Sequence, residues 1–202
     1  MIVIVDYGVG NLASVERMLK KAGVDAKLSD NPEEILAADK IILPGVGNFG
    51  HCSQSFRESG CFDAVNDFAL TLKRPVLGIC VGAQMLGSGS EEAPGAAGLG
   101  WIEMHCVKFR ADMALRVPNM GWSHIAPRND SPLFAEHSEE SRYYFVHSYH
   151  FVVEDQSHVI ATTEYGIEYA CAVQKNNIFG VQFHPEKSLR HGLALMRTFA
   201  KL

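Results

Sequence analysis

The chain has no long apolar run and no basic segment. No stretch approaches the roughly 20 apolar residues that a membrane span needs, and the 18 basic and 23 acidic residues give a formal charge of −5. We therefore expect neither a membrane protein nor a nucleic-acid-binding surface. The segment Met1–Asp6 lacks a basic start and is apolar only as far as Val5, so it predicts a buried strand rather than a signal peptide.

Cysteine is scarce and is not arranged in pairs. The five cysteines are an odd number without CxxC spacing: Cys52, Cys61, Cys80, Cys106 and Cys171. This excludes a disulfide framework and a structural zinc site, and it favours a reducing cytoplasm. His147 and His150 form an isolated His-x-x-His, which is weak evidence for a metal, and His147 is better interpreted as a structural histidine. We expect no metal and no cofactor.

Linkers, internal repeats and low-complexity segments are also absent, so the 202 residues predict a single domain over residues 1–202. In the first half, short apolar runs alternate with helical patterns, which indicates a parallel sheet with helical crossovers. The expected strands are Ile2–Val5, Val24–Leu28, Lys40–Leu43 and Pro75–Ile79, and the expected helices are 12–22, Pro32–Ala38 and Phe62–Leu72.

The second half contains many β-rich stretches and little helix before a final helix at Leu189–Leu202. The turn signal Asn176-Asn177 predicts a hairpin. The expected strands are Trp101–Phe109, Tyr143–Val146, Phe151–Val153, Val159–Thr163, Ala170–Gln174 and Ile178–Phe183. The fold class is therefore α/β, a mostly parallel central sheet flanked by helices, with additional antiparallel strands in the C-terminal half.

The most informative motif surrounds Cys80. An apolar strand leads into Gly78-Ile79-Cys80-Val81-Gly82, and a helical segment follows. G-x-C-x-G is the thiol form of the nucleophile elbow, a strained turn that exposes the reactive atom. We expect glycines at these positions because the turn brings their Cβ positions into contact, and we expect the helix dipole to favour the thiolate. A cysteine after an apolar strand is otherwise usually an inert core residue.

A base for this nucleophile lies about a hundred residues downstream at His184-Pro185-Glu186. In an extended segment, residues two apart point the same way. His184 and Glu186 would then share a face, so that the carboxylate holds one ring nitrogen while the other faces Cys80. The alternative for His184 is a plain structural histidine.

These motifs together resemble the class I (triad) glutamine amidotransferases, whose fold is flavodoxin-like. The loop Pro44–Gly47 belongs to the same resemblance. Further segments resemble the glutaminase subunits of imidazole glycerol phosphate synthases: Asp6–Asn11, Pro118–Trp122, Tyr144–Tyr149 and Val181–Ser188. The resemblance implies hydrolysis of L-glutamine to glutamate and ammonia by Cys80, His184 and Glu186. It also implies an oxyanion hole formed by the N–H of Val81 and the loop Gly45-Val46-Gly47.

The same resemblance assigns the remaining site residues. Gln84, Glu92 and the backbone around Ser148 and Tyr149 would bind glutamine. The implied partner is a (β/α)8-barrel cyclase that uses the ammonia to make imidazole glycerol phosphate and AICAR in histidine biosynthesis. Asn11, Met120 and Trp122 match positions at the interface of that heterodimer, although Met120 and Trp122 could equally be core residues.

Three alternatives remain open from the sequence. The family commonly has Pro-His-Met-Gly-Trp-Asn where this chain has Asn119 and Ser123, so a paralogue that supplies ammonia for surface-polysaccharide sugars is the nearest alternative. A free-standing cysteine hydrolase is less favoured, because such relatives usually carry histidine where Val81 follows Cys80. The match of residues 45–50 to G-x-G-x-x-G suggests a dinucleotide site only weakly, because Pro44 separates it from the strand.

Overall fold

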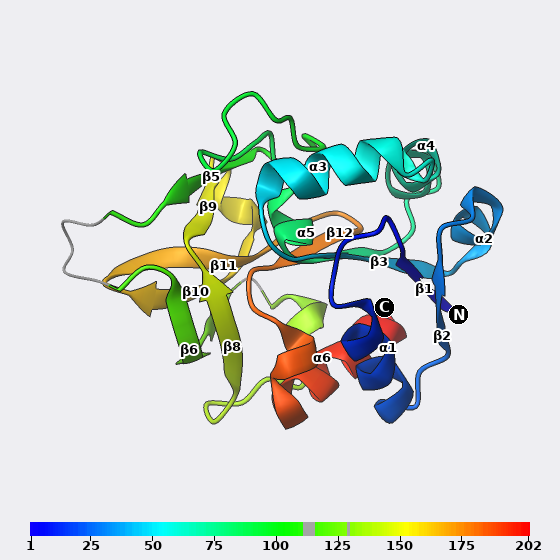
Figure 1. The fold of residues 1–202 in the computed structure, drawn as a ribbon. Helices are drawn as coiled ribbons and strands as arrows, with labels where there is room; N and C mark the ends of the chain where they lie inside the picture. The colour runs from blue at the N-terminus through cyan, green and yellow to red at the C-terminus, as the bar shows by residue number, and fades with distance from the viewer. Residues whose placement is uncertain (111–115, 129) are drawn as a thin grey trace.

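The structure is a computed structural model that describes residues 1–110, 116–128 and 130–202. In these ranges, ten strands form one mixed sheet, and β6 (Asn119–His124) pairs with β8 (Arg142–His147) in a separate ribbon (Figure 1). The parallel half has the order β2 (Ala26–Ser29), β1 (Ile2–Val5), β3 (Lys40–Gly45), β4 (Val76–Cys80) and β12 (Ile178–Val181).

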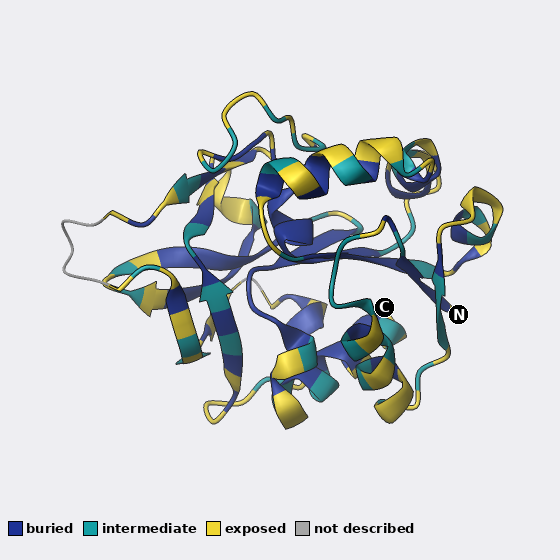
Figure 2. Cartoon of the chain, viewed as in Figure 1, coloured by how far each residue is buried: buried dark blue, intermediate teal, exposed yellow. Residues whose placement is uncertain are grey.

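Helices cover both faces of the parallel half. On one face lie α3 (Phe49–Glu58) and α4 (Phe62–Asn66), and on the other lie α1 (Leu12–Lys21) and α6 (Leu189–Lys201); α2 (Pro32–Ala37) packs near the β2 edge (Figure 1). The central strands β1, β4 and β12 are buried along their whole length (Figure 2), as expected when both faces of a sheet are covered. Apolar residues at helical spacing, such as Val15 and Leu19 of α1, complete the core.

The C-terminal half adds antiparallel strands to this sheet. β11 (Ile167–Lys175) pairs with β12, with β10 (Val159–Tyr165) and with β9 (Tyr149–Val153). β9 continues to β5 (Met104–Lys108), and β10 pairs with β7 (Ala126–Pro127). The hairpin between β11 and β12 turns at Asn176, whose φ is 54°. The predicted fold class, parallel strands with an antiparallel extension, is confirmed.

The elements that were not predicted include α3 and β6. α3 begins directly after the glycine loop, where Asn48 caps it by accepting a hydrogen bond from the N–H of His51 at 3.1 Å. Its buried residues Phe49, Cys52 and Phe56 have helical spacing, but Gly47 and Gly50 around its start favour a loop. β6 lacks the alternation of buried and exposed apolar residues because its apolar side chains face outward. No helix among the described residues could cross a bilayer.

Candidate active site

The carboxyl ends of β3 and β4 lie side by side, with Gly45 paired to Cys80 in the register. β4 runs directly into α5 (Val81–Gln84), and Cys80 at this junction has φ 54° and ψ −113°. A non-glycine residue with positive φ is strained, which is the conformation expected of a nucleophile elbow. α5 is a single turn, so the dipole effect predicted for Cys80 is smaller than that of a long helix.

The glycines of the elbow are required for a reason other than the one predicted. A Cβ built on Gly82 would lie 2.0 Å from the carbonyl oxygen of Leu43, and one built on Gly45 would lie 2.3 Å from the nitrogen of Gly82. A Cβ on Gly78 would meet the backbone of Ala83 at 2.8 Å. Backbone atoms therefore exclude side chains at all three positions: Gly82 and Gly45 lie where the elbow packs on the end of β3, and Gly78 lies against the first turn of α5.

His184 and Glu186 form a buried pair beside the elbow. Nδ1 of His184 lies 2.8 Å from Oε1 of Glu186, and the two side chains are only 2% and 1% exposed. The backbone differs from the prediction, because residues 185–187 form a 3-10 turn instead of continuing an extended strand. The N–H of His184 donates to the carbonyl of Tyr144 at 2.9 Å, and Ser188 Oγ donates to the carbonyl of His184 at 2.6 Å. These bonds fix the histidine backbone on both sides.

The environment of His184 favours its protonated form. Burial alone would lower its pKa, but hydrogen bonds to Cys80 and Glu186 outweigh burial and raise the pKa to about 9. The Oε2 atom of Glu186 has no hydrogen-bond partner among the described residues. A buried carboxylate with a single partner depends strongly on that partner's positive charge. Cys80 and Glu186 therefore both stabilise the positively charged form of His184 beside the sulfur.

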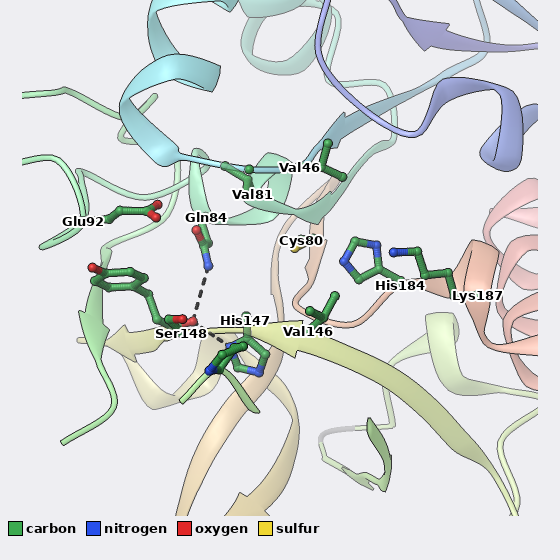
Figure 3. Close-up of a pocket in the computed structure, with 13 residues that line it drawn as sticks. Val46, Cys80, Val81, Gln84, Glu92, Val146, His147, Ser148, His184 and Lys187 are labelled. Atoms are coloured by element: carbon green, nitrogen blue, oxygen red, sulfur yellow. Dashed lines mark hydrogen bonds between the residues drawn. The ribbon is translucent and has the colours of Figure 1, made fainter. Parts of the chain in front are cut away.

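A cavity of about 310 Å³ opens over Cys80 and His184 (Figure 3). The other predicted site residues that line it are Val46, Gly47, Val81, Gln84, Glu92, Ser148 and Tyr149. Of the predicted residues, Gly45 lies beneath the cavity against the elbow, and Glu186 lies behind His184. Pro118, Val146, His147 and Lys187 also line the cavity and were not predicted as site residues.

Two buried donors hold the carbonyls of the glycine loop. The hydroxyl of Tyr7 donates to the carbonyl of Pro44 at 2.5 Å, and the thiol of Cys52 donates to the carbonyl of Val46 at 3.3 Å. Burial is the main reason that the pKa of Cys52 is raised to about 11, so this thiol remains a donor at neutral pH. Cys52 therefore makes a specific hydrogen bond to the glycine loop. Together these bonds orient the peptides that lie against the cavity.

Polar groups line the side of the cavity opposite the histidine. Gln84 Nε2 donates to the carbonyl of Tyr149 at 3.3 Å (Figure 3). Glu92 Oε2 accepts from the N–H of Phe49 at 2.7 Å. His147 is buried and its Nδ1 lies 2.7 Å from the carbonyl oxygen of Tyr149. Burial lowers the pKa of His147 to about 4, so it is neutral at physiological pH, in agreement with a structural histidine.

An exposed apolar pair lies near the cavity mouth. Met120 and Trp122 on β6 are 61% and 45% exposed, so they are surface residues, and the core alternative is wrong. The ring of Trp122 contacts Tyr144 at a centroid distance of 5.8 Å, and Lys187, which lines the cavity, lies 5.9 Å from the same tyrosine ring. Asn11 is half-buried before α1, and a Cβ built on its neighbour Gly10 would lie 3.2 Å from the side chain of Pro44.

Gln182 contacts the nucleophile, and the sequence analysis missed it as well. It is fully buried, and its Nε2 lies 3.7 Å from Sγ of Cys80. Its position two residues before His184 is a signal that could have identified it, since alternate residues of a strand share a face. No group of three or more potential metal ligands occurs among the residues that the structure describes.

The fold and this arrangement define a class of protein. The family profile described as "Glutamine amidotransferase class-I" matches residues 3–201, and the chain belongs to that family of enzymes. A solved structure titled "Crystal structure of glutamine amidotransferase" has the same fold, with a TM-score of 0.77 at 22% identity over the whole of both chains.

Closer relatives narrow the similarity to one kind of subunit. A Pseudomonas aeruginosa protein named "Imidazole glycerol phosphate synthase subunit HisH 2" is 46% identical over 202 residues, which is the full length of both chains. A Leptospira interrogans protein named as subunit HisH of the same synthase is 43% identical, again over the full length of both.

Proposed function

We propose that the chain is the glutaminase subunit of an imidazole glycerol phosphate synthase, which hydrolyses L-glutamine and delivers ammonia to a partner subunit. Relatives that carry this name match it over their full length. The observation that carries the chemistry is the contact between the thiol of Cys80, the imidazole of His184 and the carboxylate of Glu186 at one cavity.

In the first half of the reaction, the sulfur of Cys80 attacks the side-chain amide carbon of glutamine. The C=O bond opens to an oxyanion, which requires N–H donors. Val81 is the first residue of α5, so its N–H belongs to the set that has no acceptor within the helix. The glycine loop at Val46 and Gly47 supplies the second donor. The tetrahedral intermediate then collapses, the C–N bond breaks, and the imidazolium of His184 gives its proton to the departing ammonia.

In the second half, neutral His184 takes a proton from water as the water attacks the thioester carbonyl. The carbon–sulfur bond breaks, and glutamate leaves while the sulfur returns to its starting state. Glu186 holds Nδ1 of His184 throughout, so the other ring nitrogen stays directed at the reacting atoms. Gln84, Glu92 and the backbone at Ser148 and Tyr149 hold the amino-acid end of glutamine on the opposite side of the cavity.

Ammonia released into water would be protonated and would lose its nucleophilicity, so the cavity should open toward a partner. We assign that partner as a (β/α)8-barrel cyclase, which uses ammonia to form imidazole glycerol phosphate and AICAR. The exposed side chains of Met120 and Trp122, together with Asn11, form the proposed contact surface. Five buried cysteines, all unpaired, are compatible with a reducing cytoplasm as the site of this heterodimer.

The test is to purify the chain together with the cyclase from the same genome. Formation of imidazole glycerol phosphate should depend on glutamine, and the Cys80→Ala complex should work only with added ammonium salt. Failure of the two chains to form a complex, or a complex whose synthesis does not depend on glutamine, would contradict the proposal.

A second candidate is a paralogous glutaminase that supplies ammonia to a sugar-modifying enzyme of surface-polysaccharide synthesis. The observation that favours it lies on β6, where Asn119 and Ser123 depart from the family pattern beside the exposed residues Met120 and Trp122. Asn119 is buried, and its Nδ2 donates to the hydroxyl of Tyr169 at 3.1 Å. Binding to a sugar-modifying partner and not to the cyclase would favour this candidate.

A further inference from the structure

The nucleophile and the glutamine pocket are connected by a buried pair of glutamine side chains. Nε2 of Gln182 lies 3.7 Å from Sγ of Cys80, and Oε1 of Gln182 accepts from Nε2 of Gln84 at 3.1 Å. Gln182 is 0% exposed and Gln84 is 3% exposed. The N–H of Gln182 donates to the carbonyl of Cys171 at 2.8 Å, which fixes its backbone.

The carbonyl of Tyr149 determines how the side-chain amides of Gln84 and Gln182 are oriented. The carbonyl of Tyr149 can only accept, so Gln84 must direct its NH2 group at it, at 3.3 Å. The same NH2 group faces Gln182, which must therefore present its oxygen. That choice leaves the NH2 group of Gln182 directed at the sulfur of Cys80. The amide nitrogen of Gln84 faces Tyr149, and its amide oxygen points the other way (Figure 3).

Such a donor has a defined effect on the sulfur. A hydrogen bond to a charged acceptor is stronger than one to a neutral acceptor, so the amide N–H stabilises the thiolate more than the thiol. The effect is not screened by water because the residue is buried. An amide does not titrate, so this stabilisation persists at all pH values, unlike that from His184.

We propose that Gln182 is a fourth residue of the catalytic centre, which donates to the sulfur of Cys80 and holds Gln84 with its amide oxygen free for the substrate. The proposal rests on the glutaminase function proposed above. It assigns two separable effects to one side chain: the donor end acts on the nucleophile, and the acceptor end acts on glutamine binding.

Two variants separate these effects. Gln182→Met has similar length but neither donor nor acceptor, and Gln182→Glu keeps an acceptor for Gln84 while it replaces the donor with negative charge. The readouts are the pH profile of Cys80 alkylation by iodoacetamide, followed by mass spectrometry of the Cys80 peptide, and kcat and KM for glutamine. Gln54→Met, on the exposed face of α3, is the matched control.

Both variants should slow the alkylation of Cys80 several-fold, because the sulfur loses a hydrogen bond that stabilises its thiolate, with the larger change in Gln182→Glu. KM for glutamine should rise several-fold in Gln182→Met and less in Gln182→Glu. The control should match wild type in every readout. Gln182→Met introduces no charge, so it decides the question if Gln182→Glu fails to fold. A folded Gln182→Met protein with an unchanged alkylation profile would overturn the proposal.

Alkylation needs no glutamine hydrolysis. A wild-type chain that alkylates at Cys80 but does not hydrolyse glutamine even in complex with its partner would therefore reject the glutaminase function, while the contact of Gln182 with the sulfur is still tested.

Discussion

Replacing Glu186 with glutamine removes one negative charge and keeps the shape of the buried pair. A glutamine oxygen can still accept from Nδ1 of His184, which now lies 2.8 Å from Oε1 of the carboxylate. What changes is the stabilisation of the imidazolium. The pKa of His184 is about 9, against an ordinary value of 6.5, although burial acts in the opposite direction. A difference of this size corresponds to about 3 kcal/mol.

Cys80 and Glu186 both raise this pKa, so the loss of Glu186 should lower it by more than about one pH unit. The raised value means that the stabilisation from the imidazolium is fully present below pH 6.5 in wild type, and that both the stabilisation and the imidazolium are lost as the pH rises through about 9. In Glu186→Gln the loss should occur at lower pH. Since His184 must protonate the departing ammonia, kcat at pH 8 should fall about two-fold for a loss of one pH unit, and approach a further 10-fold for each additional unit.

The assay is glutamine hydrolysis by the complex between pH 6 and pH 10, together with NMR of ¹⁵N-labelled histidine to follow the His184 ring directly. Glu164→Gln, on the exposed face of β10, is the matched control and should retain the wild-type profile. A Glu186→Gln protein whose kcat falls at the same alkaline pH as wild type, and whose His184 ring titrates as in wild type, would refute the electrostatic role of the carboxylate.

Three further outcomes follow from the same geometry. Cys80→Ala should abolish glutamine hydrolysis but leave the fold, partner binding and ammonia-dependent synthesis intact; residual hydrolysis would show that the nucleophile is another residue. Gly82→Ala would place a Cβ 2.0 Å from the Leu43 oxygen, so it should lower the free energy of unfolding, measured by urea titration, by about 3 kcal/mol or more. The control Gly89→Ala, whose Cβ would lie 3.4 Å from its nearest neighbour, should change the free energy of unfolding little. The isolated chain should hydrolyse glutamine only weakly, because the partner is expected to organise the glycine loop; full turnover without a partner would contradict this.

Much of the site could be predicted because short sequence patterns correspond to local geometry. The apolar strand before Cys80 and the glycines around it specify a turn that few other residues could form. The parallel arrangement then brings the ends of β3, β4 and β12 to one edge. His184 follows β12, so its proximity to Cys80 could be expected without coordinates.

The remaining features depend on contacts between distant segments. The 3-10 turn at residues 185–187 is held by Ser188 and by pairing of His184 with Tyr144, neither of which is visible in a local pattern. The contact of Cys52 with Val46 requires knowledge that α3 starts immediately after the glycine loop. Gln182 was overlooked because an amide between two apolar residues resembles an ordinary polar position of a strand. Its two partners, Cys80 and Gln84, both lie about a hundred residues earlier in the chain.

The most direct test of the proposed chemistry is covalent labelling with a diazo-ketone analogue of glutamine, with the modified residue identified by mass spectrometry. One adduct per chain should form at Cys80, L-glutamine should protect against it, and hydrolysis should decline in proportion to labelling. An adduct on a different residue, or continued hydrolysis after Cys80 is fully labelled, would contradict the account.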